Sequence, residues 1–394
     1  MNRLTRRAFL AAGARAGLGA AALAALPRWT RAALAAHPPG TALAPDAPGA
    51  ELIVRNDWPE HWETTVEALG RSFLTPERVF FVRSHFPVPR LDPGAHRIEV
   101  AGLVRTSQTY ALDELRALPA AEAVHTLECA GNGRGLYHLA STSGTQWERG
   151  AVGTARWSGA RLATLLERAG VQPEAKHVWL EAADAAPLPG APRFLRSIPL
   201  EKAMKDTLLA MTMNDRPLPV RHGAPLRAIV PGWYGMASTK WVTRVRVEAT
   251  PSDNHFFVRG YRYTYPGEDP AQAAPVEEMR VKSLITRPLS GARVSATKGR
   301  LPVRGFAWAG PVGVRLVEVS TDSGKTWQPA GFREDSEPMA WRAWATQVDA
   351  TPGSLTILAR ATDGNGVAQP EAARPNAGGY GNNSIHRVTV RVGA

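Results

Sequence analysis

The sequence predicts two domains, an irregular α+β domain over residues 51–265 and an all-β domain over residues 281–394. The first region mixes short strand-like runs with helix-like runs and lacks a regular β-α-β alternation. Residues 267–275 then combine prolines with a lack of periodicity, which is typical of a linker. Beyond them the helical patterns stop, and short alternating runs are separated by turn residues. About seven short strands in such an arrangement indicate an immunoglobulin-like sandwich.

The individual elements follow from local patterns. In the first domain, apolar and β-branched runs predict strands at 79–82, 96–100 and 226–230, whereas 159–169 and 200–204 have helical spacing. The tetrapeptide Asp-Ser-Gly-Lys at 322–325 predicts a hairpin turn in the second domain. The strands predicted in that domain are 281–285, 301–307, 314–320, 341–348, 355–361 and 386–392.

The first 36 residues have the features of an export signal. Arg6 and Arg7 precede Ala-Phe-Leu and an alanine-rich run, and the small residues at 33–35 form an A-x-A-like cleavage site. This order predicts a twin-arginine signal peptide over 1–36 and a periplasmic mature protein, with an ordinary secretory signal or a membrane anchor as the alternatives. Arg15 makes the run a poor bilayer span, and we expect no membrane span in the mature chain. Residues 37–50 are expected to be an unstructured leader.

The charge of the chain argues against nucleic-acid binding. Residues 1–36 hold six arginines and no acidic residue, so removing them lowers the formal net charge from +12 to about +6. The remaining basic residues form no continuous run and do not alternate with aromatic residues. A modest positive charge of this kind suits an acidic protein partner better than a nucleic acid.

Cys129 is the only cysteine in the chain. One thiol cannot form an internal disulfide, and it cannot by itself hold a tetrahedral zinc ion or an iron–sulfur cluster. It is therefore either a small buried hydrophobic residue or a single-point ligand to a metal. The glycine-rich turn at 130–134 supplies backbone N–H groups and a cation, which would favour the thiolate form.

Several blocks of sequence occur in a fixed order along the chain. They are FVRSHFPVP at 81–89, CAGNGR at 129–134, TARWSG at 154–159, NDRPLPVRHGAPLR at 214–227, VPG at 230–232 and KW at 240–241, followed by DSGKTW at 322–327 and WRAW at 341–344. From about residue 51 to the C-terminus the chain resembles the sulfite oxidase family of molybdenum enzymes. Each block alone is a weak signal, whereas the ordered set is specific.

The resemblance implies that the first domain binds molybdopterin, with molybdenum held by one pterin dithiolene and by Cys129 as the single protein ligand to the metal. Thiolate sulfur suits a soft metal of this kind. Guanidinium, ammonium and backbone N–H groups are the donors that the cofactor's phosphate requires. No haem or iron–sulfur cluster is expected in this chain, which lacks a Cys-x-x-Cys-His motif. The residues implied to bind the cofactor are Arg83, His85, Cys129, Asp184, His222, Arg227, Ser238, Thr239 and Lys240.

The resemblance also implies a cationic pocket for a small sulfur oxyanion. Arg83, Arg134 and Arg342 would form the cationic cluster, with Arg342 reaching back from the second domain. The hydroxyl of Tyr261 would hydrogen-bond an oxygen ligand of the metal. Trp147 would form a wall of the pocket. Together with Cys129, these side chains are the implied catalytic set.

The implied reaction is the oxidation of sulfite to sulfate by oxygen-atom transfer, with the electrons passing to an external c-type cytochrome. Gly133 stands where many family members have a further arginine, which would suit a larger substrate, so a sulfane dehydrogenase is the first alternative. A methionine sulfoxide reductase would lack the C-terminal sandwich, and a nitrate reductase would need attached haem and flavin domains. The sandwich resembles the family's dimerisation domain and implies a homodimer. From another class, the chain could be a non-catalytic exported binding module.

Overall fold

The fold is described here from a computed structural model, over residues 49–137, 142–186, 190–333 and 337–393. Among the described residues, those from 49 to 185 and from Arg193 onward belong to one compact unit, and every helix and strand described below lies in that unit. The signal peptide predicted over 1–36 and most of the leader predicted over 37–50 lie outside the described residues.

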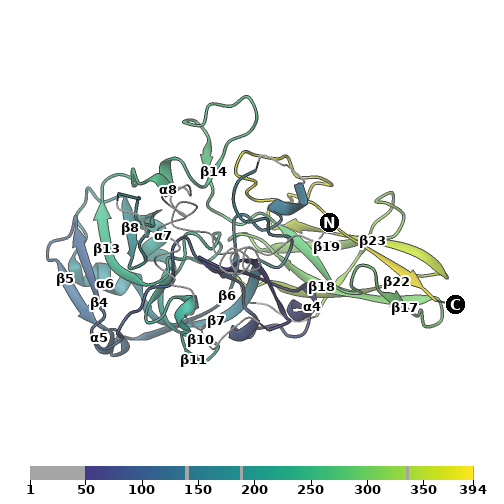
Figure 1. The fold of residues 1–394 in the computed structure, drawn as a ribbon, viewed down its shortest axis with the longest axis horizontal. Coiled ribbons are helices and arrows are strands. Elements are labelled where there is room, and N and C mark those ends of the chain that lie inside the picture. Colours follow the sequence, from purple (N-terminus) through teal and green to yellow (C-terminus); the bar gives the residue numbers. More distant parts are fainter. Residues whose placement is uncertain (1–48, 138–141, 187–189, 334–336, 394) are drawn as a thin grey trace, which may run out of the picture. The chain divides into compact units, whose positions relative to one another are not determined.

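Three main sheets build the region before residue 260 (Figure 1). The first consists of β1 (Leu52–Asn56), β2 (His61–Thr64) and β3 (Val82–Arg83). The second has the order β11-β10-β7-β6 and consists of β6 (Ala120–Glu128), β7 (Val152–Arg161), β10 (Leu208–Met213) and β11 (Arg216–Pro217), with β12 (Arg227–Ile229) paired to β10. The third has the order β5-β4-β13-β8-β9 and consists of β4 (Arg97–Gly102), β5 (Gln108–Ala111), β8 (His177–Ala182), β9 (Leu195–Pro199) and β13 (Val242–Glu248).

The helices of this region are short. They are α4 (Val66–Leu69), α5 (Leu112–Arg116), α6 (Leu162–Ala169), α7 (Leu200–Lys205) and α8 (His255–Val258), with 3-10 turns at Glu77–Val79, Arg134–Tyr137 and Val220–His222. Since helices of this length are marginal alone, they depend on the sheets they cover.

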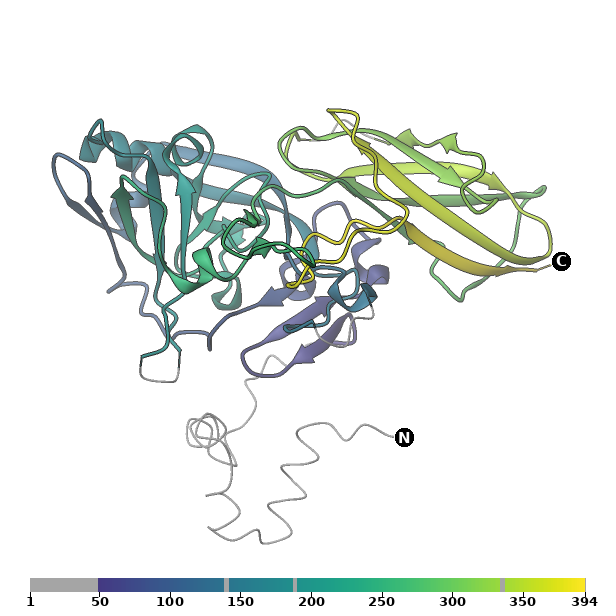
Figure 2. The same cartoon turned by 90° about the horizontal axis from the view of Figure 1, so that it is seen from above.

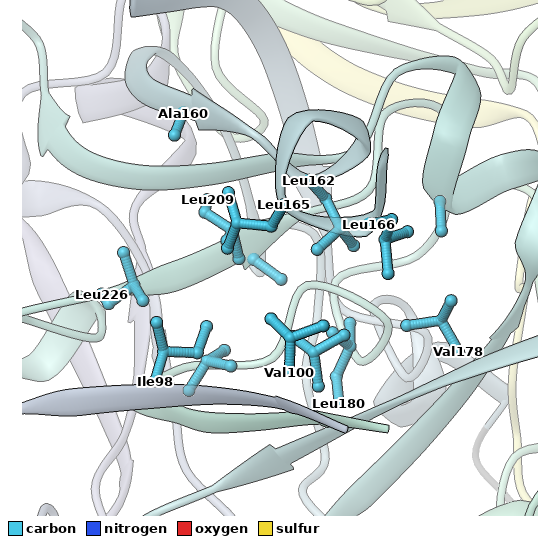
Figure 3. Packing of buried hydrophobic residues seen from close by; sticks show 14 of the residues in the cluster. Ile98, Val100, Ala160, Leu162, Leu165, Leu166, Val178, Leu180, Leu209 and Leu226 are labelled. Atoms are coloured by element: carbon cyan, nitrogen blue, oxygen red, sulfur yellow. The ribbon is translucent and has the colours of Figure 1, made fainter. Parts of the chain in front are cut away.

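Helix α6 shows how the core of this region is packed. Leu162, Leu165 and Leu166 recur at helical spacing, are fully buried, and point toward Val100 and Leu180 of the third sheet (Figure 3). The helix ends at Gly170, whose φ of 69° is the left-handed conformation that glycine adopts without strain. Truncating any of these leucines to alanine is expected to cost about 2–5 kcal/mol, because their neighbours cannot fully close the space.

The C-terminal region is a sandwich of two sheets, whose strands are seen from two directions in Figures 1 and 2. One sheet has the order β16-β18-β22-β21, with β16 (Lys282–Arg287), β18 (Arg300–Trp308), β21 (Gly331–Phe332) and β22 (Arg342–Asp349). The other has the order β17-β24-β23-β19-β20, with β17 (Arg293–Val294), β19 (Val314–Ser320), β20 (Gln328–Pro329), β23 (Gly353–Asp363) and β24 (His386–Val392). Buried side chains of both sheets, including Trp344 and Ile357, share one core.

Hydrogen bonds join the sandwich to the strand that precedes Cys129. The buried carboxylate of Glu128, the last residue of β6, accepts from Lys282 Nζ and from Trp308 Nε1 at 2.9 Å. Trp341, next to β22, donates its Nε1–H to the carbonyl of Phe73 at 3.0 Å. The end of β6 is therefore fixed by residues of the sandwich.

Most predicted elements coincide with observed ones, and all six strands predicted for the sandwich are present there. The Asp-Ser-Gly-Lys turn joins β19 to β20, as predicted. Three predictions were wrong in part. The strand predicted at 79–82 is a 3-10 turn up to Val79 and a two-residue strand from Val82, and the helix predicted from 159 begins at Leu162, because 159–161 pair with β10. The segment predicted as a linker contains β15 (Ala274–Pro275), which pairs with β14 (Arg262–Tyr263).

Within the described ranges, no helix has the length and apolar character that crossing a membrane would require.

Candidate active site

Cys129 lies at the point where β6 gives way to a tight turn. Its N–H donates to the carbonyl of Ala151 at 2.9 Å, and its own carbonyl accepts from the N–H of Asn132 at 2.8 Å. The guanidinium of Arg134 packs against Gly131, and a Cβ at this position would lie 2.7 Å from it, so a larger residue would displace Arg134. The turn holds Cys129, which is 9% exposed, at the wall of a cavity of about 710 Å³, part of which is open to solvent.

This cavity, here called the Cys129 cavity, collects side chains from segments that are far apart in the sequence. Residues from β3, from the end of β6, from the loop after β12 and from the segment before β14 all reach it. Ten of the residues implied by the sequence lie on its wall: Arg83, His85, Cys129, Asp184, His222, Arg227, Ser238, Thr239, Lys240 and Tyr261.

One side of the cavity is rich in hydrogen-bond donors held by backbone carbonyls. The guanidinium of Arg227 donates to the carbonyls of His222 at 2.8 Å and Ser238 at 3.1 Å. The ammonium of Lys240 donates to Ser84 Oγ at 2.8 Å and to the carbonyl of Arg221 at 2.9 Å. These partners are neutral, so the positive charges of both side chains are available to an anion.

Burial has pushed the pKa values of these groups away from their usual ranges. It lowers the pKa of Lys240 to about 7 and that of Arg227 to about 9, since water is excluded from the ammonium and guanidinium groups. Burial also lowers the pKa of His222 to about 3, which keeps its imidazole neutral. On the same wall, burial raises the pKa of Asp184 to about 6. A bound anion would offset the cost of keeping the two cations charged.

The other side of the cavity is built around Tyr261. Its hydroxyl lies 2.7 Å from Nε2 of His85. Burial is the main cause that holds the pKa of His85 well below its usual value, and the nearby Arg83 adds to it. A neutral imidazole can either donate or accept at Nε2, so this pair can pass a proton in either direction. Burial raises the pKa of the Tyr261 hydroxyl to about 12, which keeps it protonated.

The ring of Tyr261 is held on two sides. Tyr380, from the segment before β24, stacks on it with the ring centroids 5.2 Å apart and the planes at 25°. The guanidinium of Arg196 lies 5.2 Å from the centroid of the same ring. The backbone of Tyr261 has a φ of 55°, a conformation that non-glycine residues adopt at a cost. These contacts stabilise a strained residue whose hydroxyl must face the cavity.

Three residues implied by the sequence lie elsewhere. Arg134 donates to the carbonyls of Gly378 at 2.8 Å and Thr145 at 2.9 Å, so it braces two loops rather than lining the cavity. Trp147 is fully buried in the hydrophobic cluster that contains Cys129, but it is not on the cavity wall.

Arg342 requires the largest correction. Its guanidinium lies 3.4 Å from the centroid of the Phe332 ring and donates to the carbonyl of Val314 at 3.0 Å, so it stays within the sandwich. The residue before it, Trp341, is the one that reaches the first domain. The expectation that Arg342 reaches back into the first domain is therefore wrong, because Phe332 and Val314 hold its guanidinium within the sandwich.

Sequence reasoning missed several residues of the wall, including Ser84, Phe194 and Met236. Phe194 stacks on His85 with the centroids 3.9 Å apart and so fixes the imidazole plane. Ser84 was detectable, because it stands between Arg83 and His85 in the FVRSHFPVP block. Phe194 carried no signal, since it enters the cavity only through the pairing of β8 with β9.

Several polar atoms on the wall fit an absent anionic group. Arg83 Nη1, Arg227 Nε, Thr239 Oγ1 and Asp184 Oδ1 are buried and have no hydrogen-bond partner among the described residues. Leaving such atoms unpaired is costly, so buried polar groups are nearly always satisfied. Three of the four can donate, and the soft sulfur of Cys129 lies on the same wall. This set fits a cofactor that carries a phosphate and a soft metal.

Comparison with known proteins gives matches along nearly the whole described chain. The model of an oxidoreductase molybdopterin-binding domain matches residues 85–256, and that of a Mo-co oxidoreductase dimerisation domain matches residues 273–393. Mitochondrial sulfite oxidase of Rattus norvegicus is 38% identical over 86% of this chain and 66% of its own length, so this chain spans just under two thirds of that relative. Sulfite oxidase of Arabidopsis thaliana is 30% identical over 87% of this chain and 94% of its own length.

A solved structure shares the fold. The structure of the sulfane dehydrogenase SoxCD from Paracoccus pantotrophus superposes with a TM-score of 0.74 at 28% identity, covering 90% of this chain and 87% of the other.

Proposed function

This chain belongs to the family of molybdopterin-binding oxidoreductases that includes the sulfite oxidases, and from that premise we propose that it oxidises sulfite to sulfate at the Cys129 cavity. The observation that carries the proposal is the meeting of the single cysteine with Arg83 and the His85–Tyr261 pair on one wall. The sulfur ligand, an oxyanion-binding cation and a proton-transfer pair are the parts that this reaction requires.

Residues of this chain would hold the cofactor from two ends. The donors of Arg227, Lys240 and Thr239 suit its phosphate, and the thiolate of Cys129 suits its molybdenum. When bound, the cofactor supplies oxygen-atom transfer and two-electron redox chemistry. The neutral partners of Arg227 and Lys240 keep both cations in place for the phosphate without neutralising them.

The substrate end of the cavity depends on Arg83 and Tyr261. The unpartnered Nη1 of Arg83 can donate to an oxygen of sulfite and orient the ion. Tyr261, protonated and hydrogen-bonded to His85, can give a proton to, or take one from, an oxygen atom in the cavity. Conversion of sulfite and water to sulfate releases two protons and two electrons, so a proton path and an electron acceptor are both required.

The acceptor, the location and the assembly form part of the same proposal. We infer that the electrons pass to a c-type cytochrome and that the twin-arginine sequence at the N-terminus directs the protein to the periplasm. We also infer that the sandwich has the immunoglobulin-like topology and pairs two copies of the chain. The match of 273–393 to a dimerisation domain supports this pairing.

A second candidate is the oxidation of a sulfane sulfur, and two observations favour it. The superposition on a sulfane dehydrogenase covers 90% of this chain. In addition, Arg134 and Arg342 are turned away from the cavity, which leaves fewer cations to recognise the oxygen atoms of sulfite.

The test combines metal analysis with turnover. The full chain should be purified with its cofactor, its molybdenum content measured, and its reduction of cytochrome c followed with sulfite and with thiosulfate. Stoichiometric molybdenum with faster turnover of sulfite supports the first candidate, and faster turnover of thiosulfate supports the second. A folded protein that never acquires molybdenum would instead favour a binding module.

A further inference from the structure

A second cavity lies between the turn after Cys129 and the first strands of the sandwich. It has an empty volume of about 300 Å³ and shares no lining residue with the Cys129 cavity. Asn132 and Arg149 line it from the first domain, and Lys282, Ser283 and Asn382 line it from the sandwich. We call it the seam cavity.

Arg149 is the dominant charge on the wall of this cavity. Burial lowers the pKa of its guanidinium to about 10, and among the described residues the side chain has no hydrogen bond or ion pair. The adjacent carboxylate, Glu148, is directed to Arg55, with Oε1 and Nη2 3.0 Å apart. The nearby Glu148 carboxylate partly offsets this effect of burial, so the half-buried Arg149 guanidinium stays charged and can donate into the cavity.

Two further donors face the same space. Ser283 is 5% exposed and its Oγ has no partner among the described residues. Lys282 donates to the carboxylate of Glu128 and to the carbonyl of Asn132 at 3.3 Å. An ammonium carries three hydrogens, so one remains for a further acceptor. Lys282 therefore adds positive charge even though it already has partners.

The chemistry of this wall selects the kind of ligand. It offers a guanidinium, a hydroxyl and part of an ammonium, and the one acidic residue on the wall, Glu148, is already paired with Arg55. A compact ion with several acceptor oxygens satisfies all three donors at once. The seam cavity is also smaller than the Cys129 cavity, so a compact ion suits it better than a large ligand.

We propose that the seam cavity is a second anion site that binds a small tetrahedral oxyanion, sulfate or phosphate, through Arg149, Ser283 and Lys282. The site is defined by its own residues and does not depend on the proposed function. Because Lys282 also holds Glu128, which directly precedes Cys129, an ion bound here contacts the same residue that fixes the end of β6.

The test measures ion binding to the full, cofactor-loaded protein by equilibrium dialysis with radiolabelled sulfate, at constant ionic strength in chloride. Arg149→Met should lose one bound sulfate per chain, with at least a tenfold fall in affinity. Arg149→Lys should bind with intermediate affinity, and Ser283→Ala severalfold more weakly than the unmodified chain. Arg293→Met, which removes an exposed arginine elsewhere in the sandwich, is the matched control and should bind normally.

A second variant separates the two cavities. Arg83→Met should remove only sulfate bound in the Cys129 cavity and leave the seam site intact. Competition with unlabelled phosphate then decides which oxyanion the site prefers. Soaking crystals in selenate should give an anomalous peak within hydrogen-bond distance of Arg149. The proposal is overturned if Arg149→Met and the unmodified chain bind equal numbers of sulfate ions, or if Arg83→Met abolishes all binding.

Discussion

The hydroxyl of Tyr261 and Nε2 of His85 lie 2.7 Å apart, although the two residues are separated by 176 positions in the sequence. The bond spans two segments of the first domain, and the Tyr261 ring is in turn stacked on Tyr380 from the C-terminal region. The position of this hydroxyl therefore depends on three parts of the chain.

Replacing Tyr380 with leucine should lower kcat several-fold. An aromatic pair contributes about 0.5–1.5 kcal/mol beyond its buried area, and its loss would let the Tyr261 ring turn away from His85. Tyr380→Phe keeps the ring and should retain the activity. Turnover of sulfite across a range of pH would measure the effect, and equal profiles for Tyr380→Leu and the unmodified chain would contradict a positioning role.

Replacing Cys129 with serine should leave the fold intact and abolish sulfite oxidation. Serine fills nearly the same space, but its hydroxyl is a harder and poorer ligand for a soft metal than a thiolate. Thermal unfolding, molybdenum content and turnover should be measured on the same preparation. Retained molybdenum with near-normal turnover would mean that Cys129 is only a buried hydrophobic residue.

Arg342→Met should leave the affinity for sulfite unchanged, whereas Arg83→Met should weaken it strongly. Arg342 packs on Phe332 within the sandwich, but Arg83 faces the Cys129 cavity with an unpaired Nη1. Loss of a charge-assisted contact to a buried anion typically costs about 2–5 kcal/mol. The KM for sulfite should be measured for both variants beside their molybdenum content. A large rise in KM for Arg342→Met but not for Arg83→Met would mean that Arg342, and not Arg83, binds sulfite.

Lys282→Met should destabilise the protein by about 3–5 kcal/mol, because it leaves the carboxylate of Glu128 buried without its cation. Denaturant unfolding would measure the loss. The double variant with Glu128→Gln should recover much of it. Arg300→Met, which breaks an exposed pair with Asp349, is the control and should cost less than about 1 kcal/mol. Similar losses of unfolding free energy in Lys282→Met and Arg300→Met would contradict the role of the buried pair.

Acid should destabilise the protein between pH 7 and pH 5. Burial lowers the pKa of both His125 and His222 to about 3. As the pH falls below about 6.5, these two histidines therefore take up protons in the unfolded chain but not in the folded chain. The contribution of these neutral histidines to the free energy of unfolding is fully present above about pH 6.5. It decreases as the pH falls, by about 2 kcal/mol for each histidine at pH 5. Unfolding free energies at several pH values should show a smaller slope for His125→Gln. The exposed His255→Gln should keep the full slope, and identical slopes for the two variants would refute this origin.

The sandwich strands were predicted well from the sequence, because apolar and polar residues alternate along them and the apolar ones are those that are buried. His386–Val392, for example, is buried at every second residue. The residues of the Cys129 cavity that lie in dense motifs were implied by the resemblance to the sulfite oxidase family and not by a local pattern. Arg134 was misplaced for a physical reason, since the direction of a side chain in a turn depends on the backbone geometry and on the distant carbonyl of Gly378. Neither is visible in a local pattern.

The tertiary contacts that place Phe194 and Tyr380 at the site could not be predicted either. Phe194 precedes β9, whose register against β8 sets its position, and Tyr380 approaches through a long segment without regular structure. Such contacts depend on tertiary packing, which local propensity does not encode.

The only thiol of the chain lies on the wall of the Cys129 cavity. A colorimetric thiol reagent can therefore measure how many molecules of a preparation contain the cofactor. In denaturant, once the released cofactor has been removed, the cysteine of every chain reacts once. Under native conditions, a cofactor bound to the sulfur blocks the reaction, so the ratio of the two readings gives the fraction of empty molecules in a preparation. Activities can then be expressed per loaded site, which separates a variant that turns over slowly from one that is poorly filled.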